Sequence, residues 1–216
     1  MNTPAAPALA LMPAAWREIL QYLKMHGEAR ADALAGHLGI TPSGLRQHLA
    51  VLGRDGLVQH RELREGPGRP KHLYALTGLA DALFPRAYAE LTNELLDYAD
   101  DEDAELVGRL FERRAERRLQ GAIGRLEDKP FGAKVAEVAR ILDEDGYLAD
   151  FEAMPDGSYR LREHNCMVLG VAKRFGHACS SEIDFLRRAL PEADVQRVQH
   201  MLAGSHACAY EIRLKA

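Results

Sequence analysis

The segment from residue 16 to residue 58 constrains the fold most, because it holds three apolar helical stripes separated by glycines. Apolar side chains three and four residues apart share one face of a helix, and glycine commonly ends a helix. Thr41 can cap the third helix, and Pro42 suits its first position, where a missing N–H costs nothing. The stripes are Trp16, Ile19, Leu20 and Leu23, then Ala33, Leu34 and Leu38, then Leu45, Leu49 and Leu52, with glycines at 27 and 39. The pattern predicts a helix-turn-helix, whose second helix enters the major groove of DNA.

A hairpin with a basic tip follows this unit. Gly56 ends the third helix, and strand-like runs extend over residues 57–64 and 71–76. Between them, residues 65–70 read Glu-Gly-Pro-Gly-Arg-Pro, which is typical of a turn. Three cations lie at the tip, namely Arg64, Arg69 and Lys71. We therefore predict a wing that reaches DNA phosphates or a minor groove.

Polar side chains on the outer face of the third helix are the candidate base readers. Arginine and glutamine can hydrogen-bond the edges of guanine and adenine, so Arg46 and Gln47 suit this role. The alternative is an ordinary solvated face. The full set of predicted DNA contacts is Thr41, Ser43, Gly44, Arg46, Gln47, Arg64, Arg69 and Lys71. The distribution of charge agrees with DNA binding by this segment. Residues 14–77 carry 9 Lys and Arg against 6 Asp and Glu, although the net charge of the whole chain is -4.

Composition excludes several other classes of protein. With 216 residues, 47% of them apolar, the chain can build two modest domains with separate cores. It has no run of about 18 uncharged apolar residues and no secretory signal, so we expect a cytoplasmic protein with no membrane partner. We find no Gly-rich phosphate loop, HExxH or GxSxG motif, and so expect no enzyme. A winged helix that binds only proteins is disfavoured by the basic wing.

The patterns predict an α+β fold with an N-terminal winged helix-turn-helix, a helical connector and a small α+β sensor domain. The expected boundaries are a flexible N-terminus at 1–13, the winged helix at 14–80, the connector at 81–103 and the sensor domain at 104–216. The connector would hold one helix spanning Leu83 to Leu95, our expected dimer contact, and would end in the acidic run 97–103. In the sensor domain we expect helices near 104–123 and 131–142, a hairpin at 147–153 and 158–163, short helices at 181–190 and 191–202, and a strand at 208–214.

Three cysteines, Cys166, Cys179 and Cys208, lie in the sensor domain at the edges of predicted elements. Their odd number argues against a disulfide framework. Their spacing leaves 12 and 28 residues between them and lacks the CxxC pair of structural zinc sites, whereas thiolates suit iron-sulfur clusters. Cys179 should feel the positive end of a helix, which favours the thiolate. Inert thiols, metal or cluster ligands and a thiol switch all remain open from the residues alone.

Two parts of the sequence resemble known regulator families. Residues 40–58, with Gly68-Arg69-Pro70 and Tyr74-Ala75-Leu76-Thr77, look like the winged-helix regulators grouped with the ArsR and DeoR families. The C-terminal signature resembles that of SufR-type repressors, iron-sulfur sensors that control cluster-assembly genes. It comprises His164-Asn165-Cys166, Cys179 with Glu182, and Gly204 through Cys208-Ala209-Tyr210.

The second resemblance implies that Cys166, Cys179 and Cys208 ligate a [4Fe-4S] cluster in a homodimer that binds a double-stranded DNA operator. The chain departs from its relatives at Met167, where they often have proline, and around Ala193, where some carry a fourth cysteine. His200 and His206 are candidates for the fourth ligand by their proximity in sequence. The alternative is a winged-helix regulator that senses zinc or redox state through the same cysteines.

Overall fold

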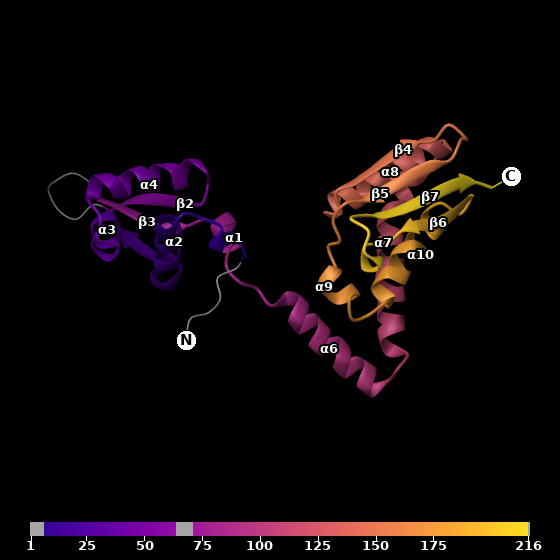
Figure 1. Ribbon diagram of the computed structural model, residues 1–216, viewed down its shortest axis with the longest axis horizontal. Coiled ribbons are helices and arrows are strands. Elements are labelled where there is room, and N and C mark those ends of the chain that lie inside the picture. The colour runs from indigo at the N-terminus through magenta and orange to yellow at the C-terminus, as the bar shows by residue number, and fades with distance from the viewer. Residues whose placement is uncertain (1–6, 64–70, 216) are drawn as a thin grey trace. The chain divides into compact units, whose positions relative to one another are not determined.

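The computed structural model describes residues 7–63 and 71–215 and forms two compact units, Met1–Arg86 and Ala87–Ala216 (Figure 1). The connector expected at 81–103 is thus divided between the units. The predicted wing residues Arg64 and Arg69 lie outside the described residues.

The first unit is a helical core closed by a small sheet. Its elements are α1 (Pro7–Ala10), α2 (Ala14–His26), β1 (Glu28–Arg30), α3 (Ala31–Leu38), α4 (Pro42–Arg54), β2 (Val58–Leu63), β3 (Lys71–Leu76) and α5 (Gly78–Asp81). The three strands are antiparallel in the order β1-β3-β2. The winged helix-turn-helix predicted from the sequence is confirmed.

Local signals explain the turn between α3 and α4. Gly39 ends α3 in the left-handed region at φ 66°, a conformation that glycine adopts without strain. The Thr41 hydroxyl then accepts a hydrogen bond from the Gly44 N–H at 3.1 Å and caps α4, with Pro42 at the first helical position. The three predicted leucines of the α4 stripe, Leu45, Leu49 and Leu52, are all buried in the core.

Two short elements of the first unit were not expected. Residues 7–10 belong to the stretch assigned to a flexible N-terminus, but they form α1, and Leu9 is only 1% exposed in the core. Strand β1 pairs with β3 from Glu28 opposite Ala75 to Arg30 opposite Leu73. Three residues are too few to show a period of two, so only the pairing with a distant strand identifies β1.

The second unit packs helices on one face of an antiparallel sheet of order β4-β5-β7-β6 (Figure 1). Its elements are α6 (Tyr88–Glu102), α7 (Leu106–Leu126), α8 (Phe131–Glu144), β4 (Ala149–Ala153), β5 (Tyr159–Glu163), α9 (Leu169–Ala172), α10 (His177–Ala189), β6 (Ala193–Gln199), a 3-10 turn η1 (Met201–Ala203) and β7 (Cys208–Leu214). The core joins residues of α7, α8 and α10 to sheet residues such as Leu161, Val195 and Tyr210. The α+β class expected for the whole chain is confirmed.

The helix expected at 191–202 is wrong, because this segment forms β6 followed by η1. In β6, Ala193 and Val195 are buried while Asp194 and Gln196 are exposed, which is the period of a strand. Pairing with β7 decides the conformation, since a segment this polar carries a weak local signal.

The single connector helix expected from Leu83 to Leu95 is also wrong. Leu83 and Phe84 pack against the core of the first unit, and α6 begins only at Tyr88. Pro85 accounts for the break, because a proline disfavours helical conformation in the residue before it. The acidic run, expected to end the connector, continues α6 as far as Glu102. None of the described helices is both long and apolar enough to cross a membrane.

Candidate functional site

The outer face of α4 presents the side chains predicted to read bases. Ser43, Arg46 and Gln47 are exposed, on the side opposite the buried leucines. Gly44 is half-buried, and a Cβ there would lie 3.3 Å from the Thr41 hydroxyl oxygen. The geometry therefore gives Thr41 and Gly44 a role in capping α4, while Arg46 and Gln47 remain available to a groove.

His48 follows these residues on α4 but is half-buried. Its Nδ1 accepts a hydrogen bond from the Trp16 indole at 3.2 Å, which links α4 to α2. His48 thus helps to fix the orientation of the recognition helix instead of extending its outer surface.

The β2–β3 hairpin carries aromatic rings at its surface in addition to charge. The His60 and His72 rings stack with their centroids 4.4 Å apart, and Tyr74 lies beside both. Arg61 forms a two-point ion pair with Glu28, at 2.6 and 2.9 Å, which links β2 to β1. Lys71 is exposed at the start of β3. The Arg61–Glu28 ion pair thus ties the β2–β3 hairpin to strand β1.

The three cysteines of the second unit converge on one small cavity of about 20 Å³. Cys166 lies in the loop between β5 and α9, Cys179 in the first turn of α10, and Cys208 at the first residue of β7. All three are free thiols. Their spacing along the sequence does not by itself bring the three cysteines together, and only the resemblance to SufR-type repressors implied a common site. Cys208 is buried, whereas Cys166 and Cys179 are half-buried.

Burial raises the pKa of all three thiols above the ordinary value. For Cys179, the sequence predicts a thiolate favoured by the N-terminus of a helix. Desolvation has the larger effect on the pKa of Cys179 and raises it, whereas the positive charge of Arg197 lowers it. A cation bound among the sulfurs would favour the thiolates that the protein alone disfavours.

Two buried carboxylates, Glu163 and Glu182, line the same cavity. Glu182 is fully engaged: Arg118 donates to both of its oxygens, at 2.9 and 3.0 Å, and the Tyr147 hydroxyl donates at 3.0 Å. Within the described part of the chain, Glu163 accepts only from the Tyr210 hydroxyl, at 3.3 Å. Burial and the nearby charge of Glu182 raise the pKa of Glu163 to about 8.

The sequence carries a signal for an inward-facing polar residue at Glu163. Strand β5 alternates, and Leu161 and Glu163 are both buried on the same face of the sheet. A glutamate at an inward position, three residues before a candidate cysteine ligand, indicates a polar site within the core.

The two histidines considered as fourth ligands differ in position. His200 lines the cavity, with its Nε2 3.4 Å from the Cys179 sulfur. His206 is exposed, and its ring lies 6.4 Å from that of His164. Ala193 pairs with Leu214, at the opposite end of β7 from Cys208. Over residues 7–63 and 71–215, no three His, Cys, Asp or Glu side chains are arranged to hold a single metal ion.

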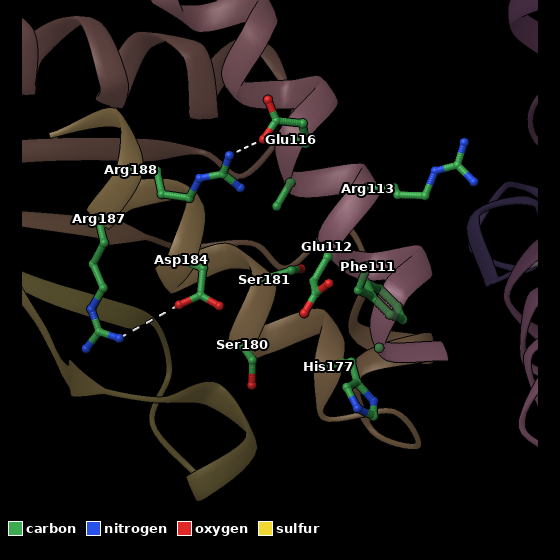
Figure 2. A pocket seen from close by; sticks show the side chains of 12 residues that line it. Phe111, Glu112, Arg113, Glu116, His177, Ser180, Ser181, Asp184, Arg187 and Arg188 are labelled. Carbon is green, nitrogen blue, oxygen red and sulfur yellow. Dashed lines mark hydrogen bonds and ion pairs between the residues drawn. The ribbon is translucent and has the colours of Figure 1, made fainter. Parts of the chain in front are cut away.

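A larger groove of about 570 Å³ lies between α7 and α10, and no cysteine is among its described lining residues. Figure 2 shows its mixed lining, in which Glu116 pairs with Arg188 and Asp184 with Arg187. The Phe111 and His177 rings are nearly parallel, with centroids 6.4 Å apart. The acids and bases of this groove largely neutralise one another, and none of the predicted site residues lines it.

Comparisons with known proteins bear mainly on the first unit. Residues 17–60 match the family described as bacterial regulatory protein, arsR family. The chain is similar to the crystal structure of RV1404 from Mycobacterium tuberculosis, at 24% identity and a TM-score of 0.31, over 36% of this chain and 54% of that one. It thus spans about half the length of that protein. No curated protein matches the sequence.

Two Bacillus subtilis structures are also similar over part of the chain. The reduced form of the transcriptional regulator YodB shows 25% identity and a TM-score of 0.29, over 43% of this chain and 82% of that one. PadR in complex with operator DNA shows 18% identity and a TM-score of 0.29, over 62% of this chain and 92% of that one.

The winged helix and its family match together define a DNA-binding transcriptional regulator of the winged-helix type. The second unit adds to this DNA-binding fold a cavity that all three cysteines line.

Proposed function

We propose that this regulator binds its operator with an affinity set by an iron-sulfur cluster held by Cys166, Cys179 and Cys208. One observation carries the proposal: thiols from three separate segments line one cavity. Thiolates are the preferred ligands of iron-sulfur clusters, so the donor set fits the group. As in the SufR-type repressors that the chain resembles, the expected action on transcription is repression by a [4Fe-4S] form.

The small size of the cavity implies that its walls move when a cluster binds. Its volume of about 20 Å³ is enough for roughly one water molecule. A cluster is larger than a water molecule, so the segments that carry the thiols must separate to admit it. Binding of the cluster therefore favours a different arrangement of the cavity walls, which is the requirement for a switch.

The wall that carries Cys166 is in direct contact with α6. The Leu169 N–H donates to the Cys166 carbonyl at 3.2 Å, so the cysteine is joined to the first turn of α9. One residue further, the Gly170 carbonyl accepts from the Asn93 side chain of α6 at 3.1 Å. A displacement of Cys166 is thereby transmitted to α6, the helix that follows the winged helix in the chain.

The opposite face of α6 has the pattern of a dimer contact. Tyr88, Leu91, Leu95 and Tyr98 are each more than half exposed. Their spacing of three, four and three residues is that of a coiled-coil seam. We place the homodimer contact on this stripe. A two-fold dimer presents two recognition helices to a pseudo-palindromic operator with half-sites about one helical turn apart.

Substituting each cysteine with serine tests the cluster. Each of Cys166→Ser, Cys179→Ser and Cys208→Ser should lose the visible absorption and the iron and sulfide content after anaerobic reconstitution. Circular dichroism should show that the winged helix stays folded, because its core is separate. Normal iron and sulfide content together with wild-type operator affinity in all three variants would show that the thiols are inert.

A second candidate is a zinc site, which the donor types of the cavity suit, although the described side chains would have to rearrange to hold a single ion. Three thiols and one imidazole form a Cys3His set, which is a common structural zinc site. Metal analysis separates the two candidates. A zinc protein would be colourless and would contain no sulfide, whereas a cluster protein contains iron and sulfide together.

A further inference from the structure

Glu163 is a buried carboxylate that lacks the partners its burial requires. The side chain is 4% exposed, and one oxygen, Oε2, accepts from the Tyr210 hydroxyl. The other oxygen, Oε1, is buried and has no hydrogen-bond partner among the described residues. An unpaired buried carboxylate oxygen is unfavourable, so its retention indicates a function that outweighs this cost.

The strand register places this carboxylate beside the thiols. Glu163 is the last residue of β5 and lies directly opposite Cys208, the first residue of β7. Residues opposite one another in an antiparallel pair project from the same face of the sheet. The carboxylate also lines the cavity that Cys166 and Cys179 reach from their own segments.

Apart from His200, the other polar groups that line the cavity in the described residues are already engaged or unsuited to binding iron. Both oxygens of Glu182 accept hydrogen bonds from Arg118. The Tyr147 and Tyr210 hydroxyls donate to Glu182 and Glu163 respectively. Arg197 is a cation. His200 contacts the Cys179 sulfur, which suits a hydrogen-bond donor to a bound thiolate.

We propose that Glu163 is the non-thiolate ligand of the cluster and binds iron through Oε1. The inference rests on the proposed cluster, because three thiolates leave one iron of a [4Fe-4S] cluster without a cysteine. Glu163 then holds that iron, and His200 hydrogen-bonds the Cys179 sulfur without binding iron. An oxygen ligand makes this iron chemically distinct from the other three.

The test compares wild-type protein with Glu163→Gln, both reconstituted anaerobically with 57Fe. Mössbauer spectra of the wild type should contain a minority component from an oxygen-ligated iron, and this component should be altered or lost in Glu163→Gln. Release of the cluster to a chelator should be at least about tenfold faster in the variant. His200→Ala is the matched control and should keep the minority component.

Two further measurements separate a ligand from a structural residue. Glutamine has nearly the shape of glutamate without its charge, so the cluster-free Glu163→Gln protein should unfold at the same temperature as cluster-free wild type, or higher. Glu163→Cys supplies a thiol at the same position and should give a cluster whose spectrum lacks the oxygen-ligated component. This second variant keeps the test decisive if glutamine disturbs folding.

The remaining outcomes each overturn the inference. A wild-type spectrum and wild-type chelator resistance in Glu163→Gln would show that Glu163 is not a ligand. Loss of the minority component in His200→Ala alone would assign the site to His200. If wild-type protein takes up no iron and sulfide at all, the proposed function itself fails, and this result differs from a loaded wild type whose cluster does not depend on Glu163.

Discussion

At the scale of single residues, Arg46 and Gln47 are exposed on α4 and have the hydrogen-bonding groups needed to read bases. A contact to a base edge depends on sequence, whereas a contact to phosphate does not. This difference allows the two roles to be separated by measurement.

We expect Arg46→Ala to weaken operator binding by about 1–3 kcal/mol and to relax the preference for one base. The matched control is Arg69→Ala, a wing residue chosen from the sequence, which should weaken binding to operator and random DNA alike and reduce the dependence on salt. Titrations on both DNAs at several salt concentrations give the comparison. Equal losses on operator and random DNA for Arg46→Ala would assign Arg46 to a phosphate instead.

The sequence was sufficient to predict the fold where neighbouring residues determine the local backbone conformation. Gly39, Thr41 and Pro42 end one helix and begin the next through their own backbone preferences, so the helix-turn-helix could be predicted. It was insufficient where distant segments decide the structure. The strand β6 is stabilised by its pairing with β7. The alternation of seven residues alone does not distinguish this strand from a short helix.

The candidate site depends on such distant pairings. The sequence supplied Cys166, Cys179 and Cys208 as candidates, but a loop, a helix and a strand bring them together only in the folded unit. Glu163 reaches the cavity through its register with Cys208, which no pattern within β5 alone reveals. The convergence of these four side chains on one cavity therefore became visible only in the structure.

At the scale of elements, the contact between α9 and α6 is the proposed route of transmission. A Cβ added to Gly170 would lie 2.9 Å from the Ala89 Cβ, so α6 must shift to accommodate an alanine there. We expect Gly170→Ala to change operator affinity while the iron and sulfide content stays normal. The matched control is Gly176→Ala, because a Cβ at Gly176 meets nothing within 4 Å. Equal operator affinity in both variants and the wild type would contradict this route.

The exposed stripe of α6 makes a separate prediction about assembly. Leu91→Glu and Leu95→Glu each place a charge in the proposed seam, and burying an unpaired charge is strongly unfavourable. Both variants should sediment as monomers at micromolar concentration, where the wild type should be a dimer. Thr92→Glu, on an exposed part of the same helix beside the stripe, is the control and should perturb assembly less. Dimers of unchanged stability in both leucine variants would place the contact elsewhere.

At the scale of the whole molecule, the chain joins a DNA-binding unit to a second unit that we propose receives the signal. A cluster would link β5, α10 and β7 through their side chains and would fix the Cys166 segment where it meets α6. The effect on DNA binding can be no larger than the difference in cluster affinity between the two arrangements. No residue that contacts DNA needs to change for this regulation to occur.

The most direct test of the central claim is the operator affinity of one wild-type preparation with and without its cluster, measured anaerobically at one salt concentration. The account predicts tighter binding by the loaded form, by at least about fivefold. Cys208→Ser, treated in the same way, should show no such difference. Equal affinities for the fully loaded and cluster-free wild-type protein would contradict the account, even if the cluster itself were present.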